Sequence, residues 1–267
     1  MTTLNRRITR RDFLIRTAVF AAGACAGTGF LLKPFARALD AEAAVTPAPR
    51  IAFILDDVGF NVERVKPFLE LGARLTYAIL PQMMFSRSLA EKIHSLGHEI
   101  MLHQPMEPLN SSLNPGPGAL YLSQGKQEME RILLQNLENF PHAAGFNNHM
   151  GSRFTESRPK MKEVLAFFLE REFYFVDSCT SERSVGFATA RDMNMMAAHS
   201  YEFIDNIRTA SAAYAQFVKL KALALKHGCS VGIGHPWPET ALGLGQFLRE
   251  LKGSPFKMVY ASQITCA

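Results

Sequence analysis

The sequence predicts an α/β protein with one parallel sheet of about seven strands in a single domain. Short apolar runs alternate with helical patterns seven or eight times along the chain, which is typical of a parallel sheet that is open or closed into a barrel. The 267 residues, of which 48% are hydrophobic, can bury one large core. We therefore assign residues 50–267 to one domain.

Apolar runs place the strands of this domain, and periodic apolar residues place its helices. The strands are predicted at residues 50–57, 75–81, 99–103, 143–149, 173–178, 194–203, 230–235 and 257–262. The helices are predicted at residues 62–71, 86–98, 159–170 and 212–227, with one more ending at residue 140 and one following residue 238.

Local signals mark the ends of several elements. Ser88 and Glu91 have the spacing of a capping box, Leu89, Ile93 and Leu96 give that helix an apolar face, and Gly97 ends it. Gly228 ends the helix over 212–227 in the same way. The segment 104–123 contains four prolines and the sequence NPGPG, so we expect a long loop there.

The first 38 residues are predicted to be a twin-arginine-type signal peptide. Arg10 and Arg11, followed by Asp-Phe-Leu, precede the apolar stretch TAVFAAGACAGTGFLL and the small residues near Ala38. We expect cleavage near Ala38 and a periplasmic protein that meets the twin-arginine translocation machinery during export. The alternative is an uncleaved signal that anchors the protein in the membrane. Residues 39–49 are expected to be a flexible tether.

The charge does not indicate a nucleic-acid-binding protein. The formal net charge is +5, but five arginines lie before the apolar stretch of the signal, and the rest of the chain is near neutral. Three cysteines remain after the signal, and this odd number excludes a fully paired disulfide framework. They show no CxxC spacing, so we do not expect a cysteine metal site.

Polar side chains end five of the predicted strands, and these are the candidate functional residues. The carboxyl ends of parallel strands meet at one edge of a sheet, where ligands bind. A single histidine or aspartate at such a place means little, but five strand ends with such residues indicate a site. The residues are Asp56, Asp57, His103, Asn147, Asn148, His149, Asp177 and His235.

One carboxylate and two imidazoles would suit a divalent metal, most of all zinc with an open position for water. A second carboxylate beside the metal would act as general base, and a histidine paired with an acid would act as general acid. The adjacent Asp56 and Asp57 fit this division of roles. We expect Asp57 to ligate the metal and Asp56 to accept a proton from the attacking water.

Six segments resemble the divergent polysaccharide deacetylases, a branch of the NodB-homology superfamily, over roughly residues 50–262. The segments are FILDDVG, GHEIMLHQPMEP, NPGPGAL, NNHMGSRFT, FYFVDS and SVGIGHPWPET. The resemblance implies a distorted (β/α) barrel, one divalent metal ion, and hydrolysis of N-acetyl groups on an amino-sugar polysaccharide or oligosaccharide of the cell envelope. The alternative is a non-catalytic periplasmic protein that uses the same fold to bind a glycan or a partner.

The resemblance also implies a metal-ligand set. The first superfamily motif falls on Asp56, Asp57 and Gly59, with one residue inserted before the glycine. In the second motif His103 matches the first histidine, but Glu107 occupies the place of the second. Either Glu107 is a ligand or His149 of the next strand replaces it. We favour Asp57, His103 and His149, because a histidine-rich set suits zinc.

The remaining motifs imply catalytic and substrate-binding residues. His235 matches the histidine that protonates the leaving amine, and Asp177 lies near the acid of the fifth strand, so both are candidate catalytic residues with Asp56. Arg153 is the candidate replacement for a missing motif arginine. Two asparagines and a tryptophan are further candidates for substrate binding: Asn147, Asn148 and Trp237. Trp237 would either stack on a sugar ring or plug the end of the barrel.

Overall fold

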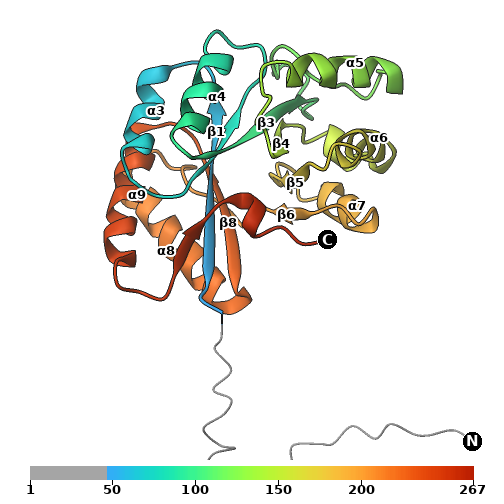
Figure 1. The fold of residues 1–267 in the computed structure, drawn as a ribbon. Coiled ribbons are helices and arrows are strands. Elements are labelled where there is room, and N and C mark those ends of the chain that lie inside the picture. Colours follow the sequence, from blue (N-terminus) through green and yellow to red (C-terminus); the bar gives the residue numbers. More distant parts are fainter. Residues whose placement is uncertain (1–46) are drawn as a thin grey trace, which may run out of the picture. The chain divides into compact units, whose positions relative to one another are not determined.

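The sheet is parallel, as the alternation of elements predicts, and it curls into a half-barrel with helices around it (Figure 1). The computed structural model describes residues 47–267, so the predicted signal peptide lies outside the described residues. Within them, residues 48–267 form one compact unit. The strand order is β6-β5-β4-β3-β2-β1-β8-β7, and β9 pairs with the start of β1.

Nine strands make up this sheet in the described part of the chain, one more than the eight segments expected from the sequence. The difference arises because the expected strand over 194–203 is divided into two. The strands are β1 Arg50–Val58, β2 Thr76–Ile79, β3 Glu99–Met106, β4 Gly145–Met150, β5 Tyr174–Asp177, β6 Ala197–His199, β7 Glu202–Phe203, β8 Cys229–Gly234 and β9 Lys257–Val259.

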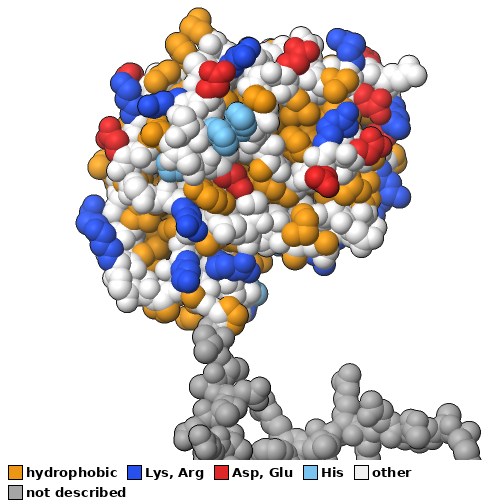
Figure 2. Space-filling model, viewed as in Figure 1, with side chains coloured by type: hydrophobic (Ala, Val, Ile, Leu, Met, Phe, Trp, Pro, Cys, Tyr) orange, Lys and Arg blue, Asp and Glu red, His pale blue; other side chains and the backbone are white. Residues whose placement is uncertain are grey.

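Helices cover the outer face of the sheet (Figure 1). They are α3 Val62–Leu69, α4 Ser86–Ser95, α5 Lys126–Leu137, α6 Arg158–Leu169, α7 Gly186–Asp192, α8 Ala210–His227 and α9 Pro238–Leu251, with short 3-10 turns at Phe154–Glu156 and Ala261–Gln263. Among the residues described, no helix has the length and apolar character needed to cross a membrane. On the face shown in Figure 2, Lys and Arg side chains are spread out, with Asp and Glu between them.

Alternation along the strands divides the apolar core into two clusters. On β1, Ile51, Phe53 and Leu55 face the helices, whereas Ala52 and Ile54 face the interior of the half-barrel. The same alternation places Met101 of β3 and Val176 of β5 on the inner face, and likewise Ile233 of β8. The residues that continue these inner rows at the carboxyl ends of the strands therefore converge on one place.

Three local expectations were wrong. Helix α4 begins at Ser86, so Ser88 lies inside the helix and no capping box forms; Glu91 instead pairs with Arg87 on the helix surface. Leu96 is half exposed because the helix ends before it, although Leu89 and Ile93 are buried as expected. The loop after β3 also begins later than predicted, because β3 continues to Met106 along β4.

The contact between α8 and α9 gives a test of the packing. A Cβ atom at Gly243 would lie 2.8 Å from Ala213 Cβ and 2.9 Å from Ala210 O, so Gly243→Ala forces the two helices apart. We expect a loss of about 1–3 kcal/mol in the free energy of unfolding, measured by urea denaturation.

Gly245→Ala in the same helix is the matched control. There the nearest contact is Leu71 Cδ2 at 3.3 Å, at the far end of a flexible side chain. Alanine has the higher helix propensity, so Gly245→Ala should be neutral or stabilising by up to about 1 kcal/mol. Equal stability changes in the two variants would contradict the close packing at Gly243.

Candidate active site

A bulge in β1 brings two consecutive aspartates to the same site. Side chains on a regular strand alternate between faces, so Asp57 would point toward the helices if Asp56 points inward. However, Leu55 pairs with Tyr77 and Val58 pairs with Ile79, which leaves one extra residue on β1. Asp57 has a positive φ of 55°, and this conformation turns its carboxylate back toward the inner face.

Three potential metal ligands from three neighbouring strands meet at this edge. Asp57 Oδ1 lies 3.2 Å from His103 Nε2 and 2.9 Å from His149 Nδ1, and the two nitrogens are 3.1 Å apart. Tetrahedral zinc, with ligand bonds of about 2.0–2.2 Å, separates its donor atoms by roughly 3.3–3.6 Å, slightly more than the distances here. The three side chains form a possible metal site, and its shape fits such an ion.

The hydrogen bonds of His103 leave its inner nitrogen free to bind a metal. Nδ1 of His103 lies 2.7 Å from Asn147 Oδ1, which accepts its proton because Asn147 Nδ2 donates to Asp56 Oδ1 at 2.8 Å. A neutral His103 then carries a lone pair on Nε2, directed at Asp57. Fixing the tautomer through the second ring nitrogen is the usual way in which proteins orient metal-binding histidines.

The surroundings of Asp57 favour a positive charge. Its buried Oδ1 makes no hydrogen bond of good geometry, although His149 Nδ1 lies 2.9 Å away, and it faces the His103 lone pair at 3.2 Å. Burial alone raises the pKa of Asp57, but His103 and His149 outweigh it and hold that pKa well below its usual range. The carboxylate is therefore ionised, and a cation bound by these three residues fits the donor set.

Asp56 lies behind the three potential ligands and is almost completely buried. Its Oδ2 is 3.6 Å from His103 Nε2, and its Oδ1 accepts the hydrogen bond from Asn147. Burial raises the pKa of Asp56, although the charges of His103 and His235 act in the opposite direction. A carboxylate with a raised pKa beside a possible metal site is suited to accept and release a proton.

His235 faces this carboxylate pair and is paired with Asp205. His235 follows the inner row of β8 and its Nε2 lies 3.9 Å from Asp57 Oδ2. Its Nδ1 lies 2.8 Å from Asp205 Oδ1, while Asp205 Oδ2 also accepts from Thr240 Oγ1. Burial alone lowers the pKa of His235, but the bond to Asp205 outweighs it and the pKa rises to about 9.

Asp205 was missed by the sequence analysis. Its side chain is buried and its backbone follows β7 by two residues, so it is a further strand-end carboxylate. The signal was present in the alternation of Phe203 and Asp205, but the strand over 194–203 was treated as one element. Asp205 supplies the acid that pairs with the histidine, for which the sequence had suggested no particular residue.

Asp177 lies on the opposite face of the sheet. Tyr174 and Val176 of β5 face the interior, and so Asp177 points toward the helices. Its Oδ2 accepts from Ser184 Oγ at 2.7 Å and from Phe187 N at 2.9 Å, at the start of α7. These bonds give it a structural role, and the expected catalytic role has no support in the structure.

Glu107 also lies apart from the three potential ligands. Its Oε2 accepts from Leu122 N at 2.7 Å, and its Oε1 lies 3.2 Å from Nη1 of Arg153. Between the two alternatives of the sequence analysis, the structure therefore brings His149 and not Glu107 to the possible metal site. Arg153, expected to bind substrate, is half exposed and held by Glu107.

The other expected substrate-binding residues have different surroundings. Asn148 is buried and joins β4 to the segment after β5: it donates to Met150 O and accepts from Ser178 N, both within the protein. Asn147 orients His103 and Asp56. Trp237 is partly buried, and the guanidinium carbons of Arg64 and Arg208 lie 4.6 Å and 3.8 Å from its ring centroid. A sugar stacking on Trp237 would have to share the ring with these arginines.

Comparison with known proteins agrees with this arrangement of motifs. The family model of divergent polysaccharide deacetylases matches residues 53–265. The chain belongs to this family.

Two relatives in sequence are uncharacterized proteins. The protein YibQ of Escherichia coli K12 is 30% identical over 204 residues, which cover 76% of this chain and 64% of YibQ. The chain thus spans less than two thirds of the length of that relative. A Haemophilus influenzae protein is 28% identical over 202 residues, covering 76% of this chain and 72% of that protein.

A solved structure shows the same fold. The crystal structure of an Agrobacterium tumefaciens C58 protein, also uncharacterized, has a TM-score of 0.78 and 19% identity, and the match covers 84% of this chain and 92% of that one.

The ligand set can be tested by measuring bound metal. His149→Ala removes one of three potential ligands, so we expect it to lose most zinc binding in a titration of metal-free protein. Glu107→Gln keeps its bond from Leu122 N and should bind zinc as the wild type does. Loss of zinc in Glu107→Gln, with zinc retained in His149→Ala, would reverse the assignment.

Proposed function

We propose that this polysaccharide deacetylase-like protein is a metal-dependent hydrolase that removes N-acetyl groups from an amino-sugar polysaccharide or oligosaccharide. We place the reaction in the cell envelope, after export to the periplasm. The observation that carries the proposal is the convergence of a possible metal site, a buried carboxylate and an Asp–His pair within one strand edge. A protein that only binds glycans needs neither a base nor an acid of this kind.

Asp57, His103 and His149 would hold the metal, for which zinc fits the donor set best. When bound, such an ion polarises a carbonyl group and lowers the pKa of water. Asn147 orients both His103 and Asp56 and so fixes the ligand and the base relative to each other. One metal ligand, His103, and the proton-transfer residue are thereby held by one side chain.

Asp56 is the proposed general base. It lies beside the ligand atoms without being one of the three that converge, and its Oδ2 is directed toward them. In the ionised form it accepts the proton of the water that attacks the acetyl carbon. Its burial raises its pKa, which makes it a stronger base than an exposed aspartate.

His235 is the proposed general acid. Asp205 accepts from Nδ1, which orients the ring and keeps it protonated, and Nε2 points toward the carboxylate pair. A protonated Nε2 can donate its proton to the amine nitrogen as the carbon–nitrogen bond breaks. The base thus lies on β1 beside the ligands, and the acid follows β8, the strand next to β1.

Variants of the paired aspartates separate the two roles. Asp57→Asn should lose zinc binding and deacetylation together. Asp56→Asn is nearly isosteric and should retain zinc, yet lose about 100-fold to 10,000-fold in the rate of acetate release from chitooligosaccharides or peptidoglycan fragments. Full activity in Asp56→Asn would contradict the mechanism. A wild type that binds zinc and these glycans but releases no acetate would favour a non-catalytic glycan-binding protein.

The pH dependence tests the Asp205–His235 pair. Because His235 must be protonated, we expect kcat/KM to fall as the pH rises through about 9. Asp205→Asn removes the charge that raises this pKa, so the fall should begin at lower pH. Asp192→Asn, an exposed aspartate of α7, is the control and should leave the profile unchanged. An identical basic limb in wild type and Asp205→Asn would exclude His235 as the acid.

A further inference from the structure

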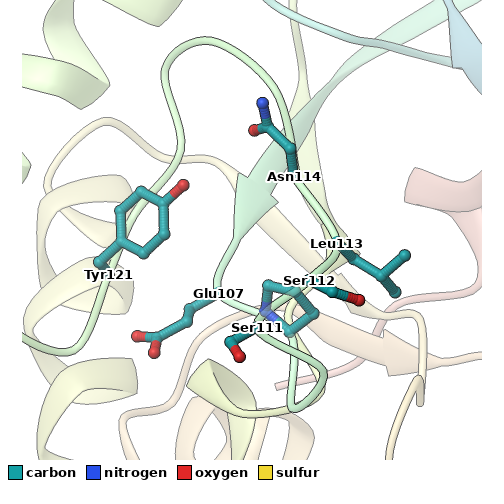
Figure 3. A pocket seen from close by; sticks show the side chains of 7 residues that line it. Glu107, Ser111, Ser112, Leu113, Asn114 and Tyr121 are labelled. Carbon is teal, nitrogen blue, oxygen red and sulfur yellow. The ribbon is translucent and has the colours of Figure 1, made fainter.

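The loop between β3 and α5 encloses a pocket that the possible metal site does not use. Its volume is about 350 Å³, within the usual range of small-ligand sites. Figure 3 shows Tyr121 and Glu107 on one side of this space and Asn114 on the other. The residues that surround it are Glu107, Pro108, Ser111, Ser112, Leu113, Asn114 and Tyr121.

Hydrogen bonds hold the loop between β3 and α5 in place. Glu107 N donates to Leu120 O, and Leu120 N donates to Pro105 O, so the loop returns along the end of β3. At its centre Gly118 O accepts from the buried amides of Gln104 and Asn136 at 2.9 Å and 2.8 Å. The end of β3 and the returning part of the loop are therefore fixed by internal bonds, and these parts need little ordering when a ligand binds.

The charges of the pocket favour a neutral, polar ligand. The Glu107 carboxylate is compensated by Arg153 and by the N–H of Leu122, so the pocket offers no free positive charge to an anion and no uncompensated negative charge to a cation. The rest of the lining combines hydroxyl and amide groups with one aromatic ring and the apolar side chains of Pro108 and Leu113. Neutral sugars, with many hydroxyl groups and an apolar ring face, have the matching chemistry.

The pocket adjoins the possible metal site along the strands. Pro105 of β3 pairs with His149 of β4, and Glu107 lies only two residues beyond Pro105, roughly 7 Å along an extended chain. The backbone N–H groups of Arg153 and Phe154, just after β4, both donate to Glu107 O. The two segments that position His149 therefore also position Glu107.

We propose that this pocket is a second sugar subsite, which binds a neighbouring unit of the glycan whose N-acetyl group lies at the metal site. Glu107 accepts hydrogen bonds from sugar hydroxyl groups while Arg153 and Leu122 N hold its carboxylate in place, and Tyr121 contacts the ring. This inference rests on the proposed function and extends it, because it makes the protein selective for chains rather than single sugars.

The length dependence of the reaction tests the subsite. With β-1,4-linked N-acetylglucosamine oligomers of two to six units, the wild-type kcat/KM should be about tenfold higher for the hexamer than for the dimer, mainly through KM. In Glu107→Gln and Tyr121→Ala this ratio should fall toward one. Glu170→Gln, at the opposite end of the sheet, is the matched control and should keep the wild-type ratio. A wild-type ratio in both pocket variants would overturn the subsite.

Binding measured without turnover separates this inference from the proposed function. Calorimetric titration of Asp56→Asn should show tighter binding of the hexamer than of the dimer, and adding Glu107→Gln should remove the difference. Zinc content should be equal in both proteins. If no oligomer is deacetylated but this difference is present, the proposed function fails and the subsite stands. If acetate is released but the hexamer and dimer bind equally, the subsite fails and the function stands.

Discussion

The candidate active site depends on one backbone feature, the extra residue in β1 at Asp57. On a regular strand the two aspartates would point to opposite faces, and one carboxylate would lie in the apolar layer between sheet and helices. The positive φ of Asp57 and the register shift against β2 remove this conflict. A non-glycine residue in this region is strained by roughly 1–3 kcal/mol, and it persists only where its surroundings compensate. Here the imidazoles of His103 and His149 supply that compensation.

The same site is costly to the fold for an electrostatic reason. Asp56, His103 and Asn147 are buried at the end of an apolar half-barrel, where an uncompensated charge costs several kcal/mol. Each of these side chains has a polar partner inside the barrel, and Asn147 serves both of the others. Asn147 therefore contributes to stability and to the orientation of the site at once. Its removal would leave a buried carboxylate and a buried imidazole short of partners.

Much of the site could be predicted because strand ends in a parallel sheet meet at one edge. That rule alone brought together Asp56, Asp57, His103, His149 and His235. It failed where the face of the strand mattered: Asp177 and Ser178 are neighbours, but only Ser178 continues the inner row of β5. It also failed for Asp205, because the short strand before it was not separated from its neighbour. The capping box predicted at Ser88 does not form for a different reason. The hydrogen bond from Ser86 Oγ to Leu80 O fixes the start of α4 at Ser86.

Metal and protons compete for the same positions in this arrangement. Without a cation, the lone pair of His103 and the carboxylate oxygen of Asp57 face each other, and a proton on the imidazole is the simplest way to reconcile them. The neighbouring carboxylates accordingly raise the pKa of His103 against the effect of its burial. A divalent ion supplies the same positive charge at the same place, so its binding releases that proton. A proton therefore balances the charges of the site when no ion is bound. The three residues that would hold the ion already lie in the positions that its binding needs.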